Sequence, residues 1–234
     1  MSSSTRLLDP LVGADVAVFS AEADRLRVLL VRRALEPFAH RWALPGAVLD
    51  PNVDADLEAT ARRALRDKIQ VELPYLDQVA AFSGSVRDPR GWSVSVLFYA
   101  LLPRDRIEAV VRSRVEALEW ADAERPGHRL AFDHAAMLRE ARRRLREKVE
   151  HRALPLHLLG ERFTLTELQR VCEAVLGRAL DKSAFRRRLA DSPDLVELSG
   201  EFVTGRQRPA QLYRACDGFS FERDVRREVA RAGG

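Results

Sequence analysis

The sequence predicts an α/β protein built from a mixed-sheet domain and a smaller C-terminal domain of helices and a hairpin. Short, valine-rich apolar runs fill much of the first hundred residues, as is typical of strands. One amphipathic helix, expected over 54–70, interrupts these runs. After residue 161 the pattern changes to two short helices and a basic hairpin. We therefore expect two domains, 1–153 and 154–234.

Two strand pairs are expected before residue 103. The runs "ADVAVFS" and "LRVLLVRR" flank the charged turn "AEADR", and "QVAAFSGS" and "WSVSVLFYALL" flank "VRDPRG", whose Asp-Pro and Gly favour a turn. The helix between the pairs carries one apolar stripe, which should lie against the sheet. The stripe consists of Leu57, Ala61, Leu65 and Ile69.

A further helix and strand are expected from residue 106 to about 122, followed by a long helix over 132–152. The apolar stripe of the long helix is formed by Leu138, Ala141, Leu145 and Val149. Its run "REARRRLREK" is interpreted as a solvated, ion-paired face in preference to a nucleic-acid contact. The segment "ALPLHLLG", 153–160, is the predicted linker between the domains.

The C-terminal part has the element order of a winged helix-turn-helix. "FTLTELQRVCEAVLG" is a helix with Thr164 or Thr166 as its N-cap, and "KSAFRRRLADS" follows after a short turn. The remaining "LVELSGEFVTGRQRPAQLYRAC" reads as a hairpin with a basic loop. This order is typical of domains that insert the second helix into DNA.

Side chains of the second short helix divide into an apolar and a basic side. Phe185 and Leu189, four residues apart, should face inward, which turns long hydrogen-bond donors towards solvent. Arginines on the hairpin loop are placed to follow a phosphate strand or to enter the minor groove. The predicted DNA contacts are Thr166, Lys182, Ser183, Arg186, Arg187, Arg206 and Arg208.

Composition limits the other classes of function. The formal net charge is only +4 over 234 residues, so the distribution of charge matters more than its sum. The two cysteines, Cys172 and Cys216, have no CxxC spacing, so neither a disulfide framework nor a metal site is expected. No apolar run is long enough for a signal peptide or a membrane span. We expect a soluble cytoplasmic protein without membrane contact.

The stretch "LLVRRALEPFAHRWALPGAVLD" resembles the Nudix hydrolase superfamily at the entrance to its signature, and the following helix fits that signature when it is anchored on Arg63. The resemblance implies a Nudix-type α/β/α sandwich. Where the family carries the glutamates that bind its metal ions, this chain has Ala55, Ala64 and Lys68, and Asp67 is a shortened substitute. Because pyrophosphate cleavage needs cations held by such carboxylates, we expect no enzymatic activity and no cofactor.

Three other acids keep the hydrolase alternative open. Asp54, Asp56 and Glu58 would supply carboxylates if the register were different, although acids at a helix N-terminus are usual for electrostatic reasons alone. A magnesium-dependent ADP-ribose pyrophosphatase is therefore the rival hypothesis.

"FSGSVRDPRGWSVSVLFYALLP" resembles the corresponding segment of ADP-ribose-type Nudix domains and of their regulatory relatives. The resemblance implies that Arg87 and Arg90 meet phosphates and that Trp92 or Phe38 stacks on an adenine. The alternatives are that 88–91 is an ordinary turn and that Arg63 only braces the Nudix loop. The ligand residues implied by the resemblance are Arg33, Phe38, Trp42, Gly46, Arg63, Lys68, Arg87, Arg90 and Trp92.

Together with "AFDHAAMLREARRRLREKV" and the C-terminal segments, the chain resembles the NrtR-type regulators, Nudix-related repressors of NAD metabolism genes, over about residues 10–215. The resemblance implies a repressor that binds double-stranded operator DNA and senses ADP-ribose or a related NAD-derived nucleotide. A homodimer is expected because one recognition helix reads few bases and two-fold symmetry doubles the contacts. A regulator that senses NAD or ATP is the second alternative.

Overall fold

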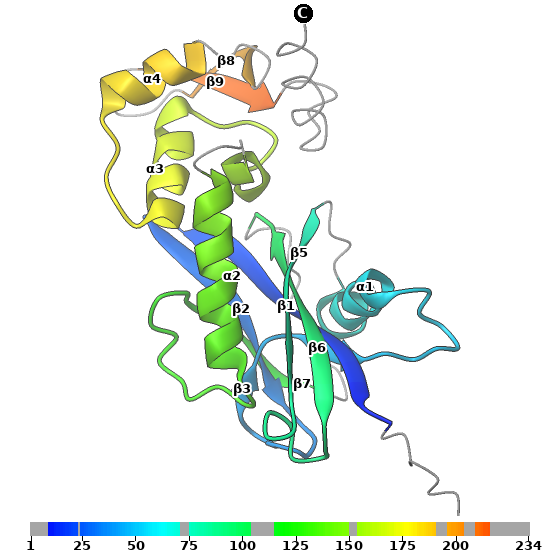
Figure 1. Cartoon of the computed structure of the whole chain (residues 1–234). Coiled ribbons are helices and arrows are strands. Elements are labelled where there is room, and N and C mark those ends of the chain that lie inside the picture. The colour runs from blue at the N-terminus through cyan, green and yellow to red at the C-terminus, as the bar shows by residue number, and fades with distance from the viewer. Residues whose placement is uncertain are drawn as a thin grey trace, which may run out of the picture. The chain divides into compact units, whose positions relative to one another are not determined.

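The computed structural model describes residues 9–22, 24–70, 75–103, 115–149, 154–190, 196–203 and 209–215. The chain divides into two compact units (Figure 1). The first comprises Met1–Ser20 and Arg27–Arg144, and the second comprises Ala21–Leu26 and Leu145–Gly234. No helix in the described ranges is both long enough and apolar enough to cross a lipid bilayer.

A seven-stranded sheet runs through the first unit. Its main path has the order β3-β2-β1-β6-β5, while β4 pairs with β1 and β7 pairs with β2. The pair β1–β6 is parallel and the pairs that β4, β5 and β7 form are antiparallel, so the predicted mixed sheet is confirmed. The strands are β1 Leu11–Glu22, β2 Arg25–Arg33, β3 Trp42–Ala43, β4 Gly46–Val48, β5 Leu76–Gly84, β6 Ser93–Leu101 and β7 Val115–Asp122.

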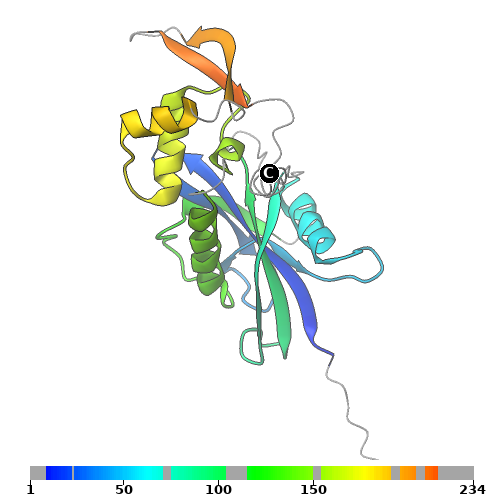
Figure 2. The ribbon, with the colours of Figure 1, turned by 45° about the horizontal axis from the view of Figure 1, so that its top comes forward.

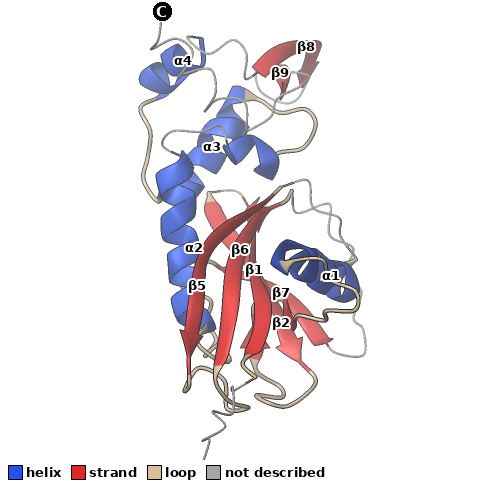
Figure 3. Cartoon of the chain, turned by 45° about the vertical axis from the view of Figure 1, so that its right-hand side comes forward, coloured by secondary structure: helices blue, strands red, loops and turns tan. Residues whose placement is uncertain are grey.

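Helices cover both faces of this sheet, α1 (Leu57–Ile69) on one and α2 (His134–Val149) on the other (Figure 3). Strand alternation explains the two apolar faces. Val16 and Val18 of β1 belong to the core cluster that contains the predicted α1 stripe, whereas the buried Ala17 and Phe19 point to the opposite face. On that face α2 buries Met137, Leu138 and Ala141.

The helix α1 begins three residues later than its sequence pattern predicts. Asp56 has an extended backbone, and its carboxylate accepts a hydrogen bond from the Ala59 N–H at 2.7 Å. This N-cap satisfies an amide that the helix itself leaves unpaired. The expected helix upstream of β7, at 106–114, lies outside the described residues.

The second unit contains a 3-10 helix, η2 Leu154–Leu158, followed by α3 Leu165–Leu176, α4 Lys182–Ala190, β8 Val196–Val203 and β9 Ala210–Ala215 (Figure 2). The helices and the antiparallel hairpin confirm the predicted order. The prediction that 153–160 is a linker is wrong, because Leu156 and Leu158 are buried and Leu156 belongs to this unit's core with Phe163 and Leu168. A run of alternating leucines around a single proline, Pro155, gives no local sign of whether the run is packed.

Candidate functional site

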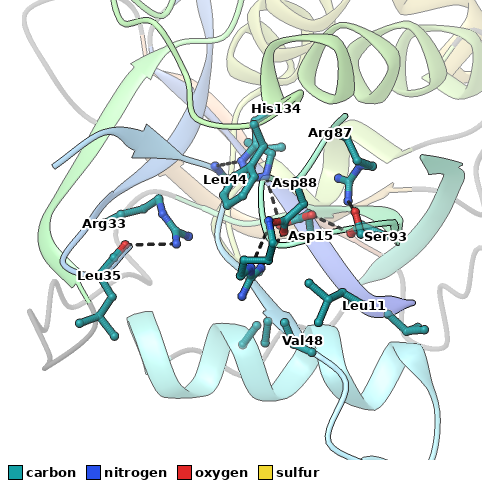
Figure 4. A pocket seen from close by; sticks show the side chains of 18 of the residues that line it. Leu11, Asp15, Arg33, Leu35, Leu44, Val48, Arg87, Asp88, Ser93 and His134 are labelled. Atoms are coloured by element: carbon teal, nitrogen blue, oxygen red, sulfur yellow. Dashed lines mark hydrogen bonds and ion pairs between the residues drawn. The ribbon is translucent and has the colours of Figure 1, made fainter. Parts of the chain in front are cut away.

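A cavity of about 610 Å³ opens in the first unit, where β1, β4 and β6 meet α1 and the start of α2 (Figure 4). Its lining mixes carboxylates, hydroxyls and cations with apolar side chains. Six of the nine predicted ligand residues line it: Arg33, Gly46, Arg63, Lys68, Arg87 and Arg90.

The other three predicted ligand residues are not part of the cavity lining. Phe38 packs edge-on against Phe132, with ring centroids 4.8 Å apart. Trp42 stacks on His128 at 5.0 Å, and Trp92 is 43% exposed. The aromatic side chain that does line the cavity is Phe132, which the sequence analysis did not single out.

Gly46 allows two strands to approach closely at the cavity wall. It lies opposite Asp15 in the β1–β4 register. A Cβ atom at this position would lie 2.0 Å from Asp15 Oδ1 and 2.7 Å from the backbone oxygen of Ala14. Only glycine fits there without displacing the Asp15 carboxylate, so Gly46 shapes the wall.

Three polar side chains that the sequence analysis missed form a connected group in the cavity. Ser95 donates its hydroxyl hydrogen bond to Asp15 Oδ2 at 2.7 Å, and His134 Nε2 lies 3.5 Å from Asp15 Oδ1. His134 is fully buried, and burial lowers the pKa of its imidazole. A carboxylate between a hydroxyl and a neutral imidazole is suited to accept hydrogen bonds from ligand hydroxyls. Asp15 within an apolar strand was the signal available in the sequence.

The arginines of the β5–β6 connection are held by carboxylates. Arg87 forms two hydrogen bonds to Asp133, at 2.9 and 3.0 Å, and a third to Ser93. Arg90 binds Asp88 through Nε at 3.0 Å and Nη2 at 2.7 Å. Burial alone would raise the pKa of Asp88, but the hydrogen bonds from Arg90 bring it below its ordinary value.

Arg63 is also held by a carboxylate. Its guanidinium binds both oxygens of Asp54 at 2.7 Å and also donates to the Val48 carbonyl at 2.9 Å. The Asp54 side chain is only 1% exposed and also accepts a hydrogen bond from Thr60. The hydrogen bonds from Arg63 hold the pKa of Asp54 far below its ordinary value. This is the geometry of an arginine that braces the loop before α1, although its side chain also lines the cavity.

The side of α1 that faces the cavity carries Ala64, Asp67 and Lys68. Lys68 Nζ donates a hydrogen bond to the Gly46 carbonyl, and Asp67, which is 59% exposed, lies 4.0 Å from Arg63. The acids that kept the hydrolase alternative open have other partners. Asp54 binds Arg63, Asp56 caps α1 and Glu58 pairs with Arg62 at 2.8 Å. Within the described ranges, no three His, Cys, Asp or Glu side chains are grouped to hold a metal ion.

In the second unit, α3 begins at a reciprocal capping box. The Thr164 hydroxyl accepts from the Glu167 N–H, and the Glu167 carboxylate accepts from the Thr164 N–H. Of the two expected N-caps, Thr164 is therefore the cap, and Thr166 is exposed. The helix ends at Gly177, whose φ of 69° is the left-handed conformation that glycine adopts readily.

The turn between α3 and α4 is fixed by side chains. Glu173 accepts hydrogen bonds from the Leu180 N–H at 2.8 Å and from Gln169 at 3.0 Å, and Gln169 also donates to the Leu180 carbonyl. The Phe163 and Tyr213 backbones pair through two hydrogen bonds of 2.9 and 2.8 Å, which joins the hairpin to the start of α3. Helices and hairpin thus form one connected unit.

Phe185 and Leu189 of α4 pack against the core of the second unit, as expected. The opposite side of α4 is exposed and carries no acidic residue of the helix itself, so it presents positive charge to an approaching polyanion. Its exposed polar residues are Lys182, Ser183, Arg186, Arg187 and Arg188. The predicted contacts Arg206 and Arg208 lie outside the described residues.

Models of two known protein families match this chain, one over each part. A model of the NUDIX domain matches residues 10–145, and a model of the NrtR DNA-binding winged helix domain matches residues 155–215. The chain belongs to the NrtR family of Nudix-related regulators. It is 42% identical, over 88% of its length and 82% of the relative's, to the ADPR responsive transcriptional repressor NtrR of Acinetobacter baylyi.

Solved structures of NrtR proteins are similar as well. The chain matches Shewanella oneidensis NrtR complexed with a 27mer DNA with a TM-score of 0.79 and 37% identity, over 87% of this chain and 93% of the other. It matches the NUDIX domain of Shewanella oneidensis NrtR complexed with ADP ribose with a TM-score of 0.55 and 34% identity, over 62% of this chain and 94% of the other.

Proposed function

We propose that this NrtR-family chain is an ADP-ribose-responsive transcriptional repressor that binds ADP-ribose in the Nudix cavity without cleaving it. One observation carries the proposal: the same chain holds a polar cavity in its Nudix unit and an exposed, acid-free basic helix α4 in its winged-helix unit. The Shewanella relatives, crystallised with DNA and with ADP ribose, support both halves.

The cavity suits a ligand that combines negative charge with hydroxyl groups. Arginine and lysine side chains provide donors for phosphate oxygens, and Asp15 and Ser95 provide acceptors for ribose hydroxyls. ADP-ribose contains both kinds of group, as NAD does. Titration with each nucleotide in turn distinguishes ADP-ribose from NAD and from ATP.

The residues present do not fit the magnesium ions that Nudix hydrolases use. Magnesium prefers oxygen ligands, chiefly carboxylates and water. Here Ala64 offers a methyl group, and Lys68 places an ammonium on the Gly46 carbonyl, where its charge opposes a cation. We therefore propose that the chain does not hydrolyse its ligand, because Ala55, Ala64 and Lys68 stand where the hydrolases have glutamates.

For DNA, we propose that α4 contacts the operator through Lys182, Ser183, Arg186 and Arg187, and that Thr166 at the start of α3 is a further contact. Arg206 and Arg208 on the hairpin loop are proposed to contact the phosphate backbone. A homodimer would double the bases that one helix reads, and the target genes are proposed to be those of NAD metabolism.

The test combines DNA selection with ligand titration. Genomic fragments that the purified chain retains are sequenced, and binding to the selected fragment is followed by fluorescence anisotropy with ADP-ribose, NAD or ATP added in turn. ADP-ribose is expected to change the affinity at lower concentration than NAD or ATP, with no AMP released in the presence of magnesium. Sustained AMP release would favour the pyrophosphatase, and retention of no specific fragment would refute the repressor.

A further inference from the structure

The four arginines that line the cavity differ in what they bind. Arg63, Arg87 and Arg90 each donate two hydrogen bonds to one carboxylate. The acceptors are Asp54, Asp133 and Asp88 respectively. A guanidinium that already has a bidentate carboxylate partner gains little from a second anion, because the carboxylate largely compensates its charge. These three arginines are therefore best suited to holding the cavity walls.

Arg33, at the end of β2, has no such partner. Its Nε donates to the Pro37 carbonyl at 2.8 Å and its Nη2 to the Leu35 carbonyl at 3.3 Å. Its guanidinium carbon lies 4.8 Å from the centre of the Phe132 ring. Among the described residues, Arg33 forms no ion pair within 4 Å, and its Nη1 makes no hydrogen bond.

The surroundings of Arg33 leave its charge only partly compensated. Burial, and then the nearby charge of Arg90, lower the pKa of its guanidinium. Asp15, Asp88 and Glu36 favour the charged form from a distance but do not pair with it. Arg33 is thus a half-buried cation held by neutral carbonyls and an aromatic ring, and an anionic ligand would complete its environment.

The side chain is also fixed in position. Two carbonyls hold one edge of the guanidinium and the Phe132 ring packs on its face, so little side-chain entropy remains to be lost when a ligand binds. Figure 4 shows Arg33 held at the Leu35 carbonyl on the cavity wall. A fixed donor is the arrangement that planar recognition of phosphate oxygens requires.

We propose that Arg33 is the residue that binds the anionic group of the ligand, the diphosphate of a nucleoside diphosphate, whereas Arg63, Arg87 and Arg90 position the walls around it. The inference deepens the proposed function and rests on it for the identity of the ligand. The family resemblance implied that the arginines of the β5–β6 turn, Arg87 and Arg90, are the phosphate contacts, whereas their carboxylate partners favour Arg33 for this role.

The test is calorimetric titration of the full chain with ADP-ribose and, separately, with inorganic pyrophosphate. Arg33→Gln keeps hydrogen-bond donors but removes the charge, and it is expected to weaken binding of both by about tenfold or more, since a charge-assisted bond is lost. Arg33→Lys should recover only part of the loss because the ammonium lacks the fork. The matched control is Arg32→Gln, on the same strand, whose exposed side chain pairs with Glu116. It should bind like the parent.

The outcomes separate a failure of the Arg33 inference from a failure of the proposed ligand. Binding of either anion by Arg33→Gln within about twofold of the parent would overturn the Arg33 inference and leave the proposed function intact. A parent that binds pyrophosphate but not ADP-ribose, with pyrophosphate binding lost in Arg33→Gln, would overturn the ligand assignment and support Arg33. A parent that binds neither anion would overturn both. The midpoint of thermal unfolding is measured for Arg33→Gln and for the parent. Equal midpoints would show that the variant is folded, so that a loss of binding is not caused by misfolding.

Discussion

His134 Nδ1 accepts a hydrogen bond of 2.9 Å from the backbone N–H of Leu44, although 90 residues separate them in the sequence. The bond is buried, and it ties the first residue of α2 to the segment between β3 and β4. Because Nδ1 is the acceptor, the neutral ring carries its proton on Nε2, on the side of Asp15. One imidazole thus joins the helix, the strand connection and the cavity carboxylate.

Removing this acceptor should destabilise the Nudix unit. His134→Ala leaves the buried Leu44 N–H without a partner, and we expect a loss of about 1–3 kcal/mol in the free energy of unfolding. Urea titration followed by circular dichroism measures it. His40→Ala, at an exposed histidine that pairs with Glu116, is the control and should stay close to the parent. Equal stability of both variants would show that the Leu44 bond contributes nothing.

Mild acid should destabilise the C-terminal unit through His157. Burial lowers the pKa of His157 to about 4. An unfolded histidine takes up a proton near pH 6.5, while the folded one stays neutral until about pH 4, so the unfolded state binds more protons in this interval. The free energy of unfolding should therefore fall as the pH falls from 6.5 towards 4. Urea titrations at several pH values should give a shallower slope for His157→Gln, and an unchanged slope would contradict the assignment.

Adding one methyl group at Gly46 should distort the cavity wall. The Cβ of Gly46→Ala would meet Asp15 Oδ1 and the Ala14 backbone oxygen, and moving them should cost about 1–3 kcal/mol of unfolding free energy. Gly160→Ala is the matched control, since the nearest atom to its Cβ would be 4.0 Å away. Chemical denaturation of the two variants compares them directly. If Gly46→Ala has the same free energy of unfolding as the parent, the Asp15 side chain and the Ala14 backbone move aside at no cost.

The exposed arginines of α4 should carry part of the salt dependence of DNA binding. For Arg186→Ala we expect weaker operator binding and, if the side chain contacts a phosphate, a reduction of about one in the slope of log affinity against log salt concentration. Fluorescence anisotropy at four salt concentrations measures both quantities. Arg62→Ala, on α1 and paired with Glu58, removes the same charge from the other unit and should leave the slope unchanged. An unchanged slope for Arg186→Ala would remove it from the contacts.

Local patterns predicted most of the secondary structure because each element carries its own periodicity. The α1 stripe at spacing four is buried at Ala61, Leu65 and Ile69, and the β1 residues alternate between the two faces of the sheet. The spacing of four residues between Phe185 and Leu189 likewise predicted that both side chains face the core of the second unit. One exception was 154–158, where the burial of Leu156 depends on α3 and on the hairpin residues that pack against it.

The sequence by itself determined the order of the elements, the loss of acids on the Nudix helix and the basic side of α4, since these depend on residue identity and on spacing within one element. Only the tertiary structure decided which cavity cations are already compensated. Arg87 meets Asp133 across 46 residues, and Asp15 meets His134 from another element. Such pairs are set by strand register and by where α2 packs on the sheet, and no local periodicity encodes either.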